Sequence, residues 1–165
     1  MQKLKINDII KRIERQETFE ATVFDNSFSI KINRYVPYCC TAIHDGSNFR
    51  EQLKKKISLD EFQRWFEEDP HTGVFISAMP ITISGLDSRF EYDLNRRPED
   101  CIYEEAWGNK VWKQRLSPTE RQASKQKHFN FYKVVHAIVS KLEELYGSCV
   151  VYDLHSYNYQ RWERD

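Results

Sequence analysis

The sequence predicts an α/β fold in which a mostly parallel or mixed central sheet is flanked by helices. Two nearly continuous apolar runs, residues 38–43 and 148–154, have the pattern of strands that are buried on both faces. The longest helical pattern, residues 117–146, leads directly into the second run. Strands that are joined through helices are typical of a parallel sheet, whose active crevice lies outside the carboxyl ends of its strands.

A helix and a hairpin are predicted before the first of these strands. Apolar residues recur at helical spacing over residues 5–15, which indicates an amphipathic helix. Segments 19–24 and 28–33 alternate apolar and polar residues on either side of a polar turn, so we expect them to pair as an antiparallel hairpin.

Weaker patterns lie between the two apolar runs. A capping-box spacing predicts a helix that begins at residue 58 and continues to residue 66. Residues 74–78 and 81–84 are short apolar pieces, and residues 89–94 alternate like a strand.

The long helix has clear predicted boundaries. Ser117 and Pro118 suit its N-cap and first turn, and Gly147 suits its C-cap. The apolar run that follows stops at His155, as the first run stops at His44. Both histidines are therefore expected at the carboxyl ends of strands.

The length of 165 residues and the mass of 19.9 kDa leave room for one domain. We expect a single domain, in which residues 1–35 hold the N-terminal helix and hairpin and residues 36–165 form the α/β core. Apolar residues make up 40% and aromatic residues 14% of the chain, which is enough to build a core and excludes wholesale disorder.

Charge and cysteine usage exclude several classes of protein. Lys plus Arg and Asp plus Glu are 25 each, and this balance disfavours a nucleic-acid binder that is led by phosphate attraction. No apolar run approaches the length of about 18 residues that a transmembrane helix needs, and the N-terminus lacks the apolar core of a secretory signal. The four cysteines contain no CxxC pair, which favours a reduced, cytoplasmic protein.

The two strand-end histidines are the first candidates for chemistry. Each could simply form hydrogen bonds at a strand end, but adjacent parallel strands would bring His44 and His155 close together. Two imidazoles and one carboxylate with an open position form a catalytic zinc set. The carboxylate could come from Glu67, Glu68 or Asp69, which otherwise are a solvated helix end. Acids at a helix C-terminus need compensation, which a metal ion would give.

Two further groups could support such a site. Asp153 would share a strand face with His155 and could orient it as a metal ligand. Arg89, Asn95 and Arg96 lie in and after the alternating segment, and a guanidinium offers a bidentate fork to a carboxylate. The alternative is an ordinary charged surface.

Four motifs in this order resemble those of the N-formylglutamate amidohydrolases and, more distantly, those of the zinc acylases and carboxypeptidases. They are His44-Asp45-Gly46, Glu68-Asp69-Pro70-His71-Thr72, Ser88-Arg89 with Asp93-Leu94-Asn95-Arg96, and Asp153-Leu154-His155-Ser156. The segment around His128 is similar to a histidine- and tyrosine-containing segment of the family. The resemblance covers roughly residues 37–160.

The resemblance implies a phosphorylase/hydrolase-like sheet and a role for each motif. It implies zinc as the cofactor, held by His44, by His155 and by Asp69 or Glu68, with Asp69 favoured and with Asp153 as the partner of a ligand. The groups that it implies for the substrate's carboxylates are Arg89, Asn95, Arg96 and His128.

The general base is the open question. Ser47 replaces a glutamate of the carboxypeptidase pattern, and Gly73 replaces an acid of the formylglutamate enzymes. The resembling enzymes supply a catalytic glutamate from later sequence, whereas this chain stops ten residues after His155. The candidate substitutes are Glu104, Glu105 and Glu163. The sheet is also expected to be incomplete at its C-terminal edge, which would stay open or be covered by a partner chain, as in a homo-oligomer.

We therefore expect a zinc-dependent hydrolase that cleaves the amide bond of a small N-acyl amino acid such as N-formylglutamate, with turnover that is weak or absent if the base is missing. The alternative is a carboxylate-binding module of the same fold. A third hypothesis is a structural α/β domain whose partner interface is the tryptophan-rich segment 107–112.

Overall fold

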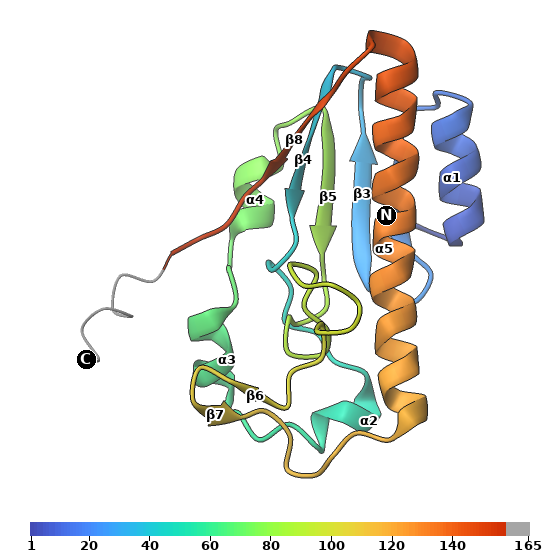
Figure 1. Ribbon diagram of the computed structural model, residues 1–165. Coiled ribbons are helices and arrows are strands. Elements are labelled where there is room, and N and C mark those ends of the chain that lie inside the picture. The colour runs from blue at the N-terminus through green and yellow to red at the C-terminus, as the bar shows by residue number, and fades with distance from the viewer. Residues whose placement is uncertain (158–165) are drawn as a thin grey trace.

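The computed structural model describes residues 1–157, which form a six-stranded mixed sheet flanked by helices (Figure 1). The prediction of an α/β fold with a mostly parallel or mixed sheet is thus confirmed. The sheet has the order β1-β2-β3-β5-β4-β8, where the strands are β1 (Gln2–Leu4), β2 (Phe19–Val23), β3 (Phe28–Ile32), β4 (Tyr38–Ala42), β5 (Ile81–Gly85) and β8 (Val150–Asp153). The helices are α1 (Ile6–Glu14), α2 (Glu51–Lys54), α3 (Glu61–Glu67), α4 (Thr72–Ile76) and α5 (Pro118–Tyr146). A second, two-stranded sheet consists of β6 (Glu105–Ala106) and β7 (Asn109–Lys110).

The strand directions put the ends of β4 and β8 side by side. Strand β4 pairs in parallel with β5 on one side and with β8 on the other, while β3 is antiparallel to β5 and forms the expected hairpin with β2. The register pairs Thr41 with Asp153, so the residues that follow both strands leave the same edge of the sheet. The predicted adjacency of the two buried-type runs is therefore confirmed.

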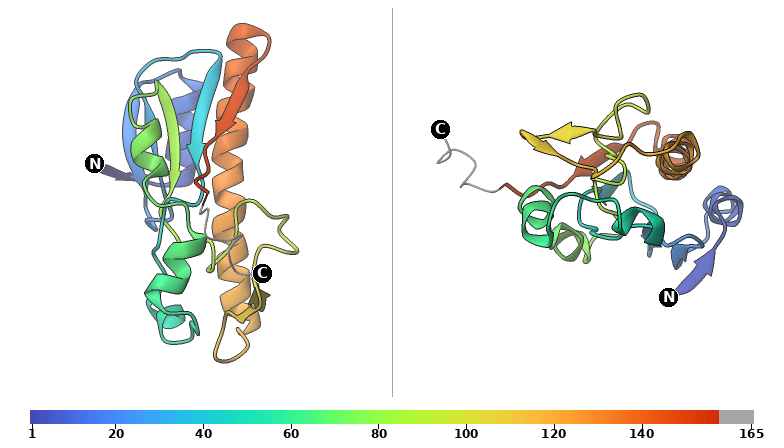
Figure 2. Two further views of the ribbon diagram at one scale, coloured as in Figure 1. Left: turned by 90° about the vertical axis from the view of Figure 1, so that its left-hand side faces the viewer. Right: turned by 90° about the horizontal axis from the view of Figure 1, so that it is seen from below.

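Helices cover both faces of the sheet. Helices α1 and α5 pack against each other, and their apolar residues join those of β2, β3 and β5 in the main core. On the other face Ile76 of α4 meets Cys40 and Ala42 of β4 in a small second core. Figure 2 shows β4 and β8 running roughly along the axis of α5. No helix of the described chain is both long and apolar enough to cross a membrane.

The boundaries of α5 follow from its end residues. Ser117 and Glu120 form a reciprocal capping box at the N-terminus, with Pro118 in the first turn. Gly147 ends the helix with a φ of 80°, a left-handed conformation that glycine adopts without strain.

Two sequence predictions about strands were wrong. Residues 89–94 form turns and irregular backbone, because their charged and apolar side chains are all buried and do not alternate between core and solvent. Strand β8 is an edge strand within the described residues: Val150, Val151 and Tyr152 are 49%, 42% and 58% exposed. An apolar run thus predicted the strand correctly, but not its burial.

Candidate active site

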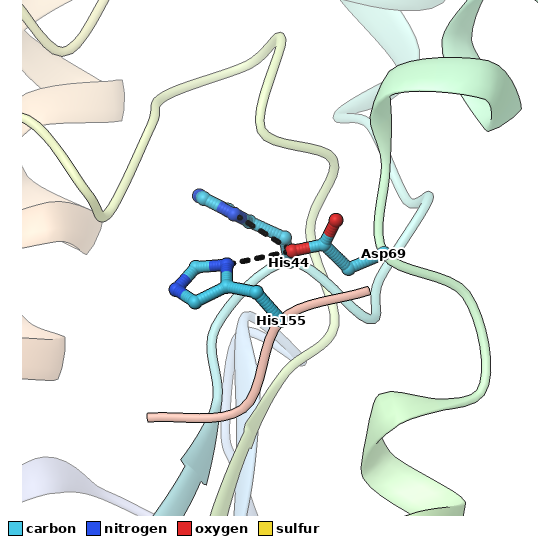
Figure 3. Close-up of side chains that lie close together, drawn as sticks. All are labelled: His44, Asp69 and His155. Atoms are coloured by element: carbon cyan, nitrogen blue, oxygen red, sulfur yellow. Dashed lines mark hydrogen bonds and ion pairs between the residues drawn. The ribbon is translucent and has the colours of Figure 1, made fainter. Parts of the chain in front are cut away.

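Three predicted ligands meet where β4 and β8 end (Figure 3). His44 follows β4, His155 follows β8, and Asp69 comes two residues after the end of α3. Asp69 Oδ2 lies 2.7 Å from His155 Nδ1 and 3.4 Å from His44 Nδ1. One ligand atom from each residue lies within 4.8 Å of the others, so the three can share one metal ion.

The charges of Asp69 and His44 stabilise each other. Burial disfavours the ionised form of Asp69, but its interactions with His44 and His155 outweigh burial and lower the pKa of its carboxyl. Burial likewise disfavours the charged imidazole of His44, but the carboxylates of Asp69 and Asp93 raise its pKa. The carboxylate is thus held in the ionised form that a metal ligand requires.

A buried carboxylate orients His44. Asp93 Oδ1 lies 2.8 Å from His44 Nε2 and also accepts the backbone N–H of Asn95. Its other oxygen, Oδ2, accepts hydrogen bonds from Arg89 Nη2 at 2.8 Å and from the Tyr103 hydroxyl at 2.5 Å. Since a carboxylate only accepts, Nε2 carries a proton, and Nδ1, which faces Asp69, is the nitrogen that remains to coordinate a metal ion.

Asp93 is a buried carboxylate that stays ionised beside His44. It is fully buried, and burial alone would raise the pKa of its carboxyl. The hydrogen bond from His44 and the charges of His44 and Arg89 instead hold this pKa well below its usual range.

Asp153 lies against His155, as the sequence predicts. Its Oδ2 is 2.9 Å from His155 Nε2, and its Oδ1 accepts a hydrogen bond of 2.5 Å from the hydroxyl of Thr41 on β4. Each histidine therefore has a carboxylate on Nε2 and directs Nδ1 toward Asp69. A symmetrical pair of imidazoles results.

Glu68 does not belong to this cluster. Its carboxyl is buried and accepts a hydrogen bond from the hydroxyl of Ser88. Burial raises the pKa of Glu68 in spite of this hydrogen bond. Of the two acids between which the sequence left the choice open, the structure brings Asp69 to the histidines and Glu68 to Ser88.

The residues expected to bind a substrate's carboxylates fall into two groups. Asn95 and Arg96 are exposed, whereas Arg89 and His128 are buried. Arg89 is bonded to Asp93 and to the carbonyl of Glu67. His128 of α5 bonds the carbonyl of Arg96 through Nε2 at 2.9 Å. Asn95 and Arg96 can therefore reach a ligand, whereas Arg89 and His128 support the segment that carries Asn95 and Arg96.

Of the three acids considered as general base, the structure describes Glu104 and Glu105, and neither belongs to the three-residue cluster. Glu104 forms an ion pair with Arg121, and Glu105 is an exposed residue of β6. Glu163 lies outside the described residues.

The sequence analysis did not assign a role to two residues of the site, Asp93 and Tyr103. Asp93 stands inside the Asp-Leu-Asn-Arg motif, and an acid within an alternating apolar segment was a signal that it needs a buried partner. Tyr103 had no such signal, because nothing in its sequence neighbourhood relates it to Asp93 or to the motif.

Two imidazoles at the carboxyl ends of parallel strands, with a carboxylate between them, are typical of an α/β protein of the hydrolase type. The family model described as N-formylglutamate amidohydrolase matches residues 36–164, and the chain belongs to this family. The resemblance drawn from the four sequence motifs is thus confirmed. Comparison with curated proteins and with solved structures gives no match.

Proposed function

We propose that the chain is a zinc-dependent amidohydrolase that cleaves the amide bond of a small N-acyl amino acid such as N-formylglutamate. Family membership supports the hydrolase class. The observation that supports a metal most directly is the convergence of His44, Asp69 and His155, whose ligand atoms lie within 4.8 Å of one another.

The donor set fits zinc. His44 Nδ1 is a buried polar atom that forms no hydrogen bond among the described residues, and its charged neighbour Asp69 Oδ2 lies 3.4 Å away, whereas Nε2 is bonded to Asp93 at 2.8 Å. A buried atom that lacks a hydrogen bond costs up to about 1–3 kcal/mol, which a metal ion would relieve. Two imidazole nitrogens and one carboxylate oxygen are the ligands of many catalytic zinc sites. Bound zinc would polarise the acyl carbonyl and lower the pKa of a bound water.

The orientation of the histidines and the binding of the substrate would then depend on other residues of the chain. Asp93 and Asp153 would fix the tautomer and orientation of the two histidines. Arg96 would hold a substrate carboxylate by a charge-assisted fork, with the side chain of Asn95 beside it. Holding the substrate at a fixed distance from the histidines places its amide bond for attack, which is a large part of the catalytic gain.

A second candidate function is a carboxylate-binding module with weak turnover or none. Three acids near the cluster are already engaged in the described chain: Asp93 by His44, Glu68 by Ser88 and Asp153 by His155. A general base that is missing typically costs a factor of about 10²–10⁴ in rate while binding is retained.

Measurements of zinc content and of formate release distinguish the amidohydrolase from the carboxylate-binding module. Chelator-treated protein that is given zinc should retain about one ion per chain, lose it in the His44→Ala/His155→Ala double variant, and keep it in the control His136→Ala, which removes an exposed histidine of α5. Zinc-dependent formate release from N-formylglutamate would support the amidohydrolase. Ligand binding without release would support the module. Equal zinc in the parent and the double variant would overturn the metal assignment.

A further inference from the structure

Arg96 is an exposed arginine whose side chain is nevertheless tethered. Its Nε–H donates to the hydroxyl of Tyr103 at 3.3 Å, and its backbone carbonyl is held by His128. A free arginine side chain samples many rotamers, and part of this freedom is lost when the side chain closes on a ligand. A tether that orders the side chain beforehand reduces this loss.

Tyr103 is itself rigidly placed. Its ring packs edge-on against Trp107 with centroids 5.7 Å apart, and its backbone carbonyl accepts a hydrogen bond of 2.7 Å from the indole of Trp112. Because Asp93 is an ionised acceptor, the Tyr103 proton must point to Asp93 Oδ2. The lone pairs of the hydroxyl are then free to accept from Arg96, which fixes the direction of both hydrogen bonds.

The same carboxylate connects Arg96 to the histidine cluster. Asp93 accepts from Tyr103 on Oδ2 and bonds His44 Nε2 on Oδ1. A continuous path of hydrogen bonds therefore runs from the His44 imidazole through Asp93 and Tyr103 to the guanidinium of Arg96. His44 and Asp93 are buried and Tyr103 is half-buried, whereas Arg96, at the end of the path, is exposed. The path sets the separation between the candidate metal ligands and the candidate carboxylate-binding arginine.

We propose that Tyr103 is a positioning residue, which holds Arg96 at a fixed distance from His44 and thereby selects ligands whose carboxylate lies at the matching distance from the reacting amide. The ligand part of this inference rests on the proposed function, whereas the tether does not. Tyr103→Phe retains the contacts of the ring and the backbone but removes the hydroxyl, which also donates to Asp93, so the test reads the order of the Arg96 side chain rather than stability.

The tether can be measured without any ligand. The Nε–Hε bond of Arg96 is the donor itself, and its ¹⁵N relaxation order parameter reports how ordered the side chain is. We expect a high order parameter in the parent and a drop in Tyr103→Phe to the value of Arg97, an arginine with an 83% exposed side chain. The control Tyr146→Phe, which removes a hydroxyl bonded to the carbonyl of Tyr35, should leave Arg96 unchanged. An Arg96 that is as mobile as Arg97 in the parent, or equally ordered in Tyr103→Phe, would overturn the proposal.

Ligand binding supplies a second readout. Calorimetry with N-formylglutamate should show affinity about fivefold weaker in Tyr103→Phe, the effect expected when one rotamer-rich side chain must be ordered on binding. In an Arg96→Ala background the same substitution should have no effect, because the residue acts through Arg96. Equal weakening in both backgrounds would overturn the positioning role. A parent that does not bind N-formylglutamate would count against the proposed function, and the relaxation measurement alone would then decide on the tether.

Discussion

Replacing Asp93 by Asn should be among the most damaging conservative changes in this chain. The substitution preserves the shape of the side chain and removes its charge. In the parent the carboxylate is fully buried and accepts from His44, Arg89, Tyr103 and the backbone N–H of Asn95. The amide of Asn can accept on one side only, so its NH₂ group must face either the donors on the Oδ1 side or those on the Oδ2 side.

The expected loss of unfolding free energy is about 3–5 kcal/mol. Arg89 is also buried, and removing one partner of a buried ion pair costs about this much because the other charge stays behind. The exposed pair Asp100–Arg97 is the matched control: its atoms are 3.4 Å apart and both side chains are more than half exposed. Asp100→Asn should therefore cost less than about 0.5 kcal/mol.

Equilibrium unfolding in urea at neutral pH, followed by tryptophan fluorescence on metal-free protein, measures both values. An Asp93→Asn variant within about 1 kcal/mol of the parent would refute the reasoning, since it would mean that the buried charge is not paired as the structure has it.

Three further predictions concern the scaffold. In Gly46→Ala the new Cβ would lie 2.1 Å from the backbone carbonyl carbon of Leu86, so a urea titration should show a loss of about 3 kcal/mol, and a loss under 1 kcal/mol would contradict this close approach. Burial raises the pKa of Asp87 to about 6 from 3.8, so the folded state binds the proton more tightly than the unfolded state. The free energy of unfolding should therefore fall, by up to about 3 kcal/mol, as the pH rises from 4 to 7. Unfolding curves of Asp87→Asn over this range should lack that fall, and a fall equal to that of the parent would assign it to other groups. Ser117→Ala removes the N-cap of α5 and should lower the thermal unfolding midpoint by the equivalent of about 1 kcal/mol. An unchanged midpoint would show that the cap does not stabilise the protein.

The sequence predicts the part of the site that depends on strands. An apolar run that stops at a histidine locates His44 and His155 at strand ends, and parallel pairing then brings them together. Asp153 follows from the same reasoning, because residues two apart on a strand share a face. These inferences need only local patterns and the general rule for α/β sheets.

The part that depends on irregular backbone could not be predicted in this way. Residues 89–94 alternate in residue type, yet both sets of side chains are buried, because Arg89 and Asp93 pair with each other inside the protein. Tyr103 comes from the irregular stretch before β6, and its bond to Asp93 depends on how that stretch folds back. Local periodicity contains no information about either contact.

The most direct test of the account is the X-ray absorption spectrum of the chain loaded with one equivalent of zinc. Zinc held by His44, Asp69 and His155 should show a first shell of nitrogen and oxygen at about 2.0–2.1 Å with the outer-shell scattering of two imidazoles, which His44→Ala should reduce to one. The chain also has four free cysteines, Cys39, Cys40, Cys101 and Cys149, which offer a different kind of site. A zinc–sulfur shell at about 2.3 Å, or a spectrum that His44→Ala leaves unchanged, would contradict the account.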